Sequence, residues 1–194
     1  MNKREQTMLN ILRRGREEFG YVGVKAEFEA EGTRTDELLR LMEIARKADL
    51  DVGLKIGGCE AVRDLIESKQ FGVEFIIAPM IETPYALHKF IDAKNKVYST
   101  EEQSNTEFLY NLETETAFQN RSSLFEKGTT DTGVDGVVFG RVDYAMSQNI
   151  SRQNINASSI TASAETVAKM CAETQQDLVV GGGISEESIP VLKI

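Results

Sequence analysis

Charged side chains follow several apolar segments of this sequence, at the points where a strand would give way to a loop. Carboxylates from different segments, together with a lysine and an arginine, are typical of a site that holds a hard cation and a small anion. Mg²⁺ or Mn²⁺ takes one or two carboxylates and completes its shell with waters and substrate oxygens. Acidic residues are also common at ordinary strand ends, so the pattern alone leaves a solvated surface open. The residues concerned are Glu27, Glu29, Lys55, Glu82, Glu113, Arg141 and Asp143.

Strand-like and helix-like patterns alternate regularly along the chain, and this alternation is what would position those residues. Between the apolar runs lie helical patterns; near residue 83, for example, Thr83 can cap a helix whose first residue is Pro84. Such alternation is the signature of a parallel sheet covered by helices. The expected strands are residues 21–28, 51–56, 73–81, 107–112, 135–139 and 177–180.

Six strand–helix units fit two architectures, an open doubly wound sheet or a (β/α)₈ TIM barrel lacking two strands. No linker or composition shift divides residues 1–194, so we expect one domain. The final segment, SEESIPVLKI, begins like an amphipathic helix and stops. We therefore expect a barrel without its C-terminal strand or strands, and self-association into a homo-oligomer through the apolar surface that this leaves open.

Composition excludes several classes of protein. The chain of 194 residues is 41% hydrophobic and 27% charged, as in globular domains, and its net charge of −9 argues against a nucleic-acid partner. No apolar run approaches the ~20 residues that cross a bilayer, so no membrane partner is expected. Cys59 and Cys171 lie on apolar helix faces without ligand or redox spacing. We expect two buried, reduced thiols and a cytoplasmic protein.

Four segments resemble the HpcH/HpaI aldolase and citrate lyase family. NLETETAFQN at 111–120 and VDGVVFGRVDYAMS at 134–147 resemble the pair of elements that supplies the family's metal carboxylates. APMIETPYAL at 78–87 resembles the element on an earlier strand, and DLVVGGGISEES resembles the strand and turn near the end of the barrel. The resemblance implies a TIM barrel and a divalent metal that holds the enolate of a small 2-oxo acid during reversible carbon–carbon bond cleavage.

Carried over residue by residue, the resemblance makes Glu113 and Asp143 the metal ligands, and it places the backbone around Val142 beside the substrate carboxylate. Lys55 takes the place of the family's substrate-binding arginine, a compact charge instead of a bidentate fork. The family's catalytic histidine is missing, because its stretch here reads Glu27-Phe28-Glu29-Ala30. The only histidine, His88, lies within a helical pattern.

The residues leave several roles open. By strand alternation Lys55 faces the barrel interior, where its partner is the substrate, Glu29 or Glu82. Glu27 and Glu29 share a face, so one can pair with Lys55 while the other orients a water that acts as base. Glu82 and Arg141 are further candidates for substrate binding. Gly181–Gly183 fits either a phosphate cradle or close packing at a strand end.

Three functions follow from these alternatives. The first is a metal-dependent class II aldolase or lyase acting on a 2-oxo acid. The second is a phosphate-binding barrel enzyme such as an isomerase. The third is a degenerate barrel that binds a ligand or partner without turning it over. The polar residues 148–161 fit either a binding lid or a flexible surface loop.

Overall fold

The computed structural model describes residues 1–193, except for the side chain of Val191, and it contains one parallel sheet. The strands pair in sequence order, β1-β2-β3-β4-β5-β6, and every pairing is parallel. Each of the predicted strands is confirmed, with ends that shift by a few residues. Their bounds are β1 Gly23–Glu27, β2 Asp51–Lys55, β3 Phe75–Ala78, β4 Glu107–Leu112, β5 Gly136–Gly140 and β6 Asp177–Gly181.

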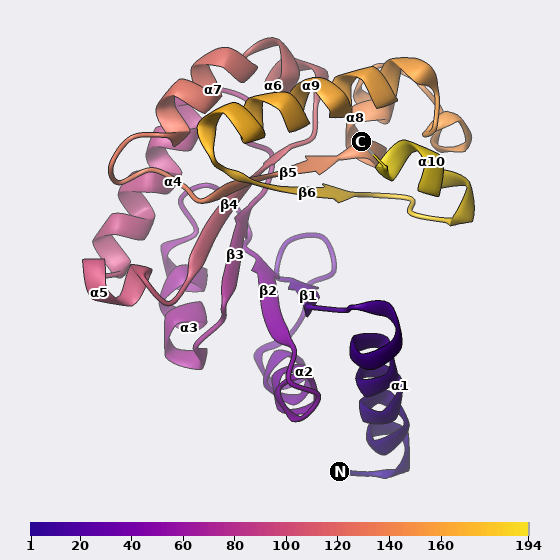
Figure 1. Cartoon of the computed structure of the whole chain (residues 1–194). Helices are drawn as coiled ribbons and strands as arrows, with labels where there is room; N and C mark the ends of the chain where they lie inside the picture. The colour runs from indigo at the N-terminus through magenta and orange to yellow at the C-terminus, as the bar shows by residue number, and fades with distance from the viewer. Residues whose placement is uncertain (194) are drawn as a thin grey trace.

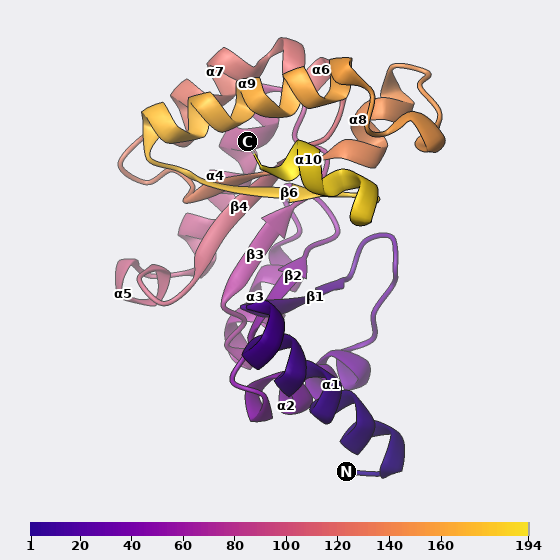
Figure 2. The same ribbon diagram turned by 45° about the vertical axis from the view of Figure 1, so that its right-hand side comes forward.

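The longer helices after β1 lie on the outer face of this curved sheet (Figures 1 and 2). Helix α1 instead packs beside α2, to which Glu5 and Arg40 join it by two hydrogen bonds of 2.6 and 2.8 Å. The α-helices are α1 Lys3–Phe19, α2 Thr35–Lys47, α3 Val62–Phe71, α4 Pro84–Val97, α5 Thr100–Gln103, α6 Glu115–Gln119, α7 Arg121–Gly128, α8 Arg141–Ser147, α9 Ser158–Thr174 and α10 Ile189–Leu192; the 3₁₀ turns are η1 Arg152–Asn154 and η2 Glu186–Ser188.

The strand order decides between the two architectures that the sequence left open. A doubly wound sheet reverses direction at a switch point, whereas here every crossover moves one strand in the same direction. Crossovers of one hand that never reverse place their helices on one face and curl the sheet toward a barrel. Within residues 1–193 the result is a six-stranded half-barrel with β1 and β6 as its edges. The barrel type is confirmed, and a closed eight-stranded barrel is not what these residues form.

The two faces of the sheet carry different layers. The outer face and the helices form the main core, which includes Leu54, Tyr110 and Phe139, all fully buried. The inner face holds a small separate cluster of Ile77, Leu109 and Val138, against which Phe75 packs. This inner cluster adjoins polar residues of the same face, since Ile77 is in register with Lys55 and Val138 with Asn111.

Local sequence signals explain most helix ends. Thr83 caps α4 by accepting a hydrogen bond from the Ala86 amide, with Pro84 in the first turn, as predicted. The polar residues 95–106 are partly helical, because α4 continues to Val97 and a capping box at Ser99 starts α5. Residues 148–161 contain η1 and the first turn of α9.

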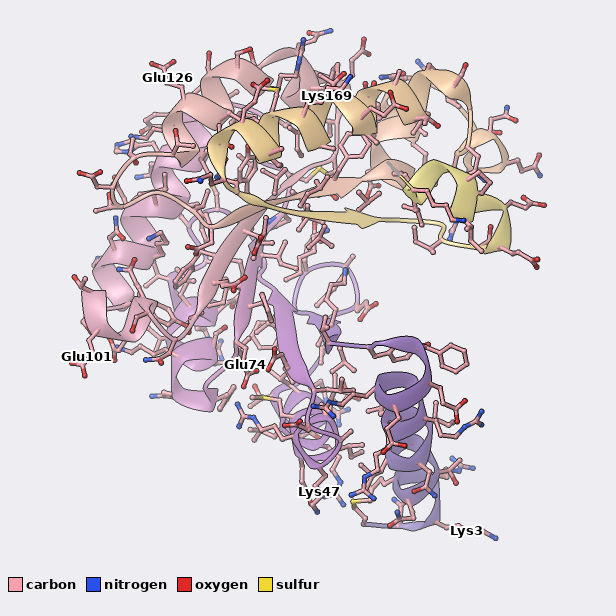
Figure 3. The ribbon with its side chains drawn as sticks, in the orientation of Figure 1. Lys3, Lys47, Glu74, Glu101, Glu126 and Lys169 are labelled. Atoms are coloured by element: carbon pink, nitrogen blue, oxygen red, sulfur yellow. The ribbon has the colours of Figure 1, made fainter. Side chains whose placement is uncertain are left out.

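Charged side chains on the surface helices point away from the sheet. Lys3 on α1, Glu126 on α7 and Lys169 on α9 project away from the sheet (Figure 3). Among residues 1–193, no helix is both long and apolar enough to cross a membrane. Val179 on β6 and Ile184 and Ile189 beyond it are about half exposed, at 46–53%. Self-association through such side chains stays a prediction.

Candidate active site

Lys55 is the centre of a buried charged cluster at the C-terminal ends of the strands. It is the last residue of β2, lies in register between Glu27 and Ile77 of the neighbouring strands, and has a side chain only 8% exposed. Its Nζ lies 2.8 Å from Oε2 of Glu29 and 3.6 Å from Oε1 of Glu113. Alternation directs Lys55 inward, as predicted, because Leu54 and Ile56 on either side are fully buried on the outer face.

Lys55 is held in its charged form. Burial alone would lower its pKa, but the hydrogen bond to Glu29 and the charges of Glu113, Glu29 and Glu27 outweigh it, so the pKa is raised above its ordinary value. A charged ammonium is a good ligand for a carboxylate or an enolate oxygen. It is a poor nucleophile, because nucleophilic attack requires the neutral amine.

Glu113 is the most buried carboxylate of the site, with a side chain 3% exposed. It follows β4 directly, and two neutral donors reach it: the Met80 amide, 3.1 Å from Oε1, and Asn111 Nδ2, 2.6 Å from Oε2. Asn111 is itself buried, and its Oδ1 has no hydrogen-bond partner among the described residues. The Glu113 carboxylate therefore accepts hydrogen bonds from two donors. Next to it, the buried acceptor Oδ1 of Asn111 has no partner among the described residues.

Sequence reasoning missed Asn111 and Met80. Asn111 could have been found, since it lies two residues before Glu113 and strand alternation places both on the same face. Met80 could not, because its contact is made by the backbone amide. That amide reaches Glu113 because Met80 adopts a left-handed conformation, with a φ of 49°, just after β3.

Glu82 is bound into the scaffold next to this pocket. Thr114, which caps α6, donates a hydrogen bond of 2.7 Å to Oε1 of Glu82, and Asn120 donates one of 2.8 Å to the Glu82 backbone carbonyl. These bonds tie the ends of β3 and β4 together. The predicted substrate-binding role of Glu82 stays a prediction, and its contacts support the geometry of the strand ends.

Asp143 follows β5, the strand that pairs with β4, and Glu113 follows β4. Asp143 is in the first turn of α8, directly after β5, is exposed, and makes no side-chain hydrogen bond or ion pair with the described part of the chain. Gly140 brings α8 against Glu113: a Cβ on Gly140 would lie only 2.7 Å from the Cβ of Glu113. Glu113 and Asp143 thus share one edge of the sheet, as the metal hypothesis requires.

Arg141 has a different environment. It is fully buried and donates to Asn156 Oδ1 at 3.0 Å and to the backbone carbonyl of Gly182 at 2.9 Å. It also reaches Ser188 Oγ at 3.2 Å. Burial lowers its pKa. These donors fasten the turn after β6 to α8, and the use of Arg141 for substrate stays a prediction.

Gly182 packs against the backbone of Val142. It has a φ of 85°, and a Cβ there would lie 2.9 Å from the Val142 amide nitrogen. Close packing, one of the two readings of the glycine run, therefore describes this turn. Val142 itself is half-buried in the first turn of α8, and its place beside a substrate carboxylate stays a prediction.

Glu27 and His88 lie outside the cluster. The half-buried Glu27 pairs with Lys25 on the same strand. On the helix surface, His88 Nε2 lies 3.3 Å from Asp92 Oδ2, one turn along α4. Glu27 still contributes to the negative charge that keeps Lys55 protonated. Of the two glutamates predicted as partners of Lys55, Glu29 is the one in direct contact with it.

A hollow lies at the N-terminal end of the strands, opposite Lys55. It has a volume of about 390 Å³, and its lining includes Glu107, Asp135 and Asp177. Burial, followed by the charges of Asp177, Asp135 and Asp51, raises the pKa of Glu107. Active sites of barrels form at the C-terminal face, and in this protein the pairing of Lys55 with Glu29 and Glu113 is at the C-terminal end. We therefore place the candidate site around Lys55 and not in the N-terminal hollow.

The donors at the C-terminal end are of the kind that a hard divalent cation prefers, oxygen atoms of carboxylates and an amide. They are the carboxylates of Glu113 and Asp143 and the unpartnered Oδ1 of Asn111, a residue that is hydrogen-bonded to Glu113. Among residues 1–193, no group of three or more His, Cys, Asp or Glu side chains is arranged to hold a metal. A metal here would take its remaining ligands from water and substrate, as Mg²⁺ commonly does. A shared cation between Glu113 and Asp143 stays a prediction.

Comparison with solved structures supports the fold that the sequence motifs indicated. The chain superposes on citrate synthase SbnG with a TM-score of 0.77 and 14% identity, over 96% of this chain and 77% of that one. An HpcH/HpaI aldolase from Desulfitobacterium hafniense gives 0.74 and 13%, over 95% and 78%. An HpcH/HpaI aldolase/citrate lyase family protein from Burkholderia cenocepacia gives 0.76 and 11%, over 97% and 80%.

These likenesses confirm the predicted resemblance at the level of the fold. Identities of 11–14% carry no residue roles by themselves. Neither a family model nor a curated protein sequence matches the chain. The function must therefore be argued from the site.

Proposed function

We propose that this protein is a metal-dependent carbon–carbon lyase of the class II aldolase type, acting on a small 2-oxo acid through an enolate. The observation that carries the proposal is the buried cluster of Lys55, Glu29 and Glu113 at the C-terminal ends of the strands. A protonated lysine beside a buried and a half-buried carboxylate, at the C-terminal end of the strands, lowers the stability of the fold, and such groups are typical of a functional site.

Glu113 and Asp143 would hold the metal, with Asn111 Oδ1 available beside them. When bound, Mg²⁺ or Mn²⁺ supplies Lewis-acid stabilisation of the negative charge on the carbonyl oxygen of the substrate. Lys55 binds the substrate carboxylate by charge. The amides in the first turn of α8, around Val142, lie at the same edge and can donate to the other carboxylate oxygen.

Retro-aldol cleavage of a 4-hydroxy-2-oxo acid then needs few groups from the chain. A base removes the proton of the C4 hydroxyl, the C3–C4 bond breaks, and its electron pair moves through C2 to the carbonyl oxygen. The products are an aldehyde and a pyruvate enolate, which takes a proton at C3. With no histidine at the expected position, a water oriented by Glu29 is the proposed base, and Glu27 is the alternative.

The test is turnover of a 4-hydroxy-2-oxo acid with and without EDTA. We expect activity that is lost on chelation and restored by Mg²⁺ or Mn²⁺. Both Glu113→Gln and Asp143→Asn should lower kcat/KM by about 10²-fold or more, because each removes charge that the metal requires. The matched control is Glu115→Gln, the same change at an exposed residue two positions along, which should retain activity.

Lys55→Ala separates binding from chemistry. If Lys55 holds the substrate carboxylate equally in the ground and transition states, the variant should raise KM by about tenfold or more and leave kcat little changed. Activity that survives both EDTA and Glu113→Gln would contradict the mechanism. A complete absence of turnover, with metal and 2-oxo acid still bound, would favour a barrel that binds its ligand without converting it.

A further inference from the structure

The positive charge next to Glu113 in this structure is a side chain of the protein itself, that of Lys55. Within residues 1–193, Lys55 is the cationic side chain within 4 Å of the Glu113 carboxylate, at 3.6 Å from Oε1. A carboxylate only 3% exposed needs a compensating charge, because the loss of hydration is not repaid by neutral donors alone. Lys55 therefore neutralises the residue that the proposed function assigns to the metal.

Lys55 has a second and closer partner. Its Nζ is 2.8 Å from Glu29, whose side chain is 25% exposed, against 3.6 Å from Glu113. A lysine ammonium is a point charge on a flexible stem and can move between acceptors. Because the contact with Glu29 already exists, losing the contact with Glu113 does not leave the charge of Lys55 unpaired.

The surroundings of Glu113 hold a position for another cation. Asn111 donates from Nδ2 to Glu113, while its Oδ1 is buried without a partner among the described residues. An unpartnered buried acceptor next to a carboxylate is satisfied by a cation or a water. The Lys55 ammonium is more than 3.5 Å from the carboxylate oxygen, so it does not fill that position at hydrogen-bond distance.

We propose that Lys55 is an internal counter-ion that competes with the divalent metal for Glu113, and that metal binding leaves it paired with Glu29 alone. This inference rests on the proposed metal site and adds a control of its affinity by two residues that are not ligands. Because like charges repel strongly in a partly buried site, the positive charge of Lys55 weakens metal binding. Glu29 strengthens it by drawing that charge away.

The experiment measures the dissociation constant for Mn²⁺ alone, without substrate, at one fixed pH by calorimetry and by the electron paramagnetic resonance signal of free Mn²⁺. Lys55→Met should bind Mn²⁺ about tenfold tighter than the wild type, or more. Glu29→Gln should bind it more weakly, and this loss should shrink in the double variant, where no lysine needs a partner. Lys25→Met, which removes an exposed charge from the neighbouring strand, should stay within about twofold of wild type.

Loss of Lys55 leaves Glu113 buried without its counter-ion, so Lys55→Met should be less stable than the wild type when no metal is present. Circular dichroism with and without Mn²⁺ measures this, and folding restored by Mn²⁺ supports the proposal. If Lys55→Met stays unfolded in both conditions, Lys55→Gln decides, since its amide can still donate to Glu113 without carrying a charge. That variant too should bind Mn²⁺ more tightly than the wild type.

The outcomes separate this inference from the lyase function. Equal or weaker Mn²⁺ binding by the neutral Lys55 variants, with aldolase activity intact in the wild type, overturns the inference alone. The expected order of affinities without any turnover supports the inference and contradicts the lyase function. Failure of every variant to bind Mn²⁺ at millimolar concentration overturns both.

Discussion

The backbone amide of Met80 donates a hydrogen bond to Oε1 of Glu113, with a nitrogen–oxygen distance of 3.1 Å. Met80 makes this contact from a left-handed conformation, with a φ of 49°, and its side chain is 46% exposed. Such a conformation costs a residue other than glycine about 1 kcal/mol or more. Strain at the end of β3 is thus coupled to a buried donor for the carboxylate of the site.

Substitutions at Met80 test this relationship. Met80→Gly should leave the free energy of unfolding unchanged or raise it by up to about 1 kcal/mol, since glycine adopts a positive φ without strain and little apolar burial is lost. Met80→Val should lower it by about 1–2 kcal/mol, because a branched Cβ is least compatible with this backbone. Urea denaturation measures both. Equal stabilities for the two variants would show that the backbone is not strained there.

Arg141 should be required for the turn after β6. Its guanidinium is fully buried and donates to Gly182, Asn156 and Ser188. Arg141→Ala removes these donors, leaves the Gly182 carbonyl without its side-chain partner and should lower the free energy of unfolding by about 2–4 kcal/mol. Arg141→Lys should recover only part of the loss, because lysine has no fork of donors. Amide hydrogen exchange should show the loss of protection concentrated around the β6 turn.

The matched control for Arg141 is Arg152→Ala, at an exposed arginine of η1. It should change the unfolding free energy by no more than about 0.5 kcal/mol. A similar cost at both positions would mean that buried hydrogen bonding is not the reason for the effect.

The acidic N-terminal end of the sheet should make stability depend on pH. The pKa of Glu107 is raised above its ordinary value of 4.5 by burial and by Asp177, Asp135 and Asp51. A raised folded pKa means that the stabilising contribution of the protonated form is fully present below the unfolded value and is lost as the pH rises through the folded value. Glu107→Gln should therefore be more stable than the wild type at pH 7.

The gain from Glu107→Gln should disappear as the pH falls below the ordinary value of 4.5, where the wild-type carboxyl is protonated as well. Thermal unfolding from pH 4 to pH 8 measures the difference. The control, Glu126→Gln on the exposed face of α7, should show no such pH-dependent gain. A stability difference that is constant with pH would exclude ionisation of the buried Glu107 carboxyl as the cause.

The sequence determined the elements of this protein and the end of the sheet that carries its charges. Apolar runs bounded by helical patterns predicted all six strands, and alternation around Leu54 and Ile56 predicted that Lys55 faces inward. Motifs around Glu113 and Asp143 indicated a barrel-type fold, and solved structures with that fold superpose on the chain. These features depend on the local period of the chain and on short motifs, so they can be read without coordinates.

Only the tertiary structure decided which charged groups meet. The choice of a half-barrel over a doubly wound sheet depends on strand order, which local patterns do not encode. The pairing of Lys55 with both Glu29 and Glu113, across the end of β3, depends on that order and on the curvature of the sheet. The same holds for Arg141, which sequence placed among the substrate-binding residues and whose donors the fold directs to the turn after β6. At a strand end, several partners lie within reach of one charged side chain. Packing selects among them, because a buried charge is stable only when an opposite charge or a hydrogen bond compensates it.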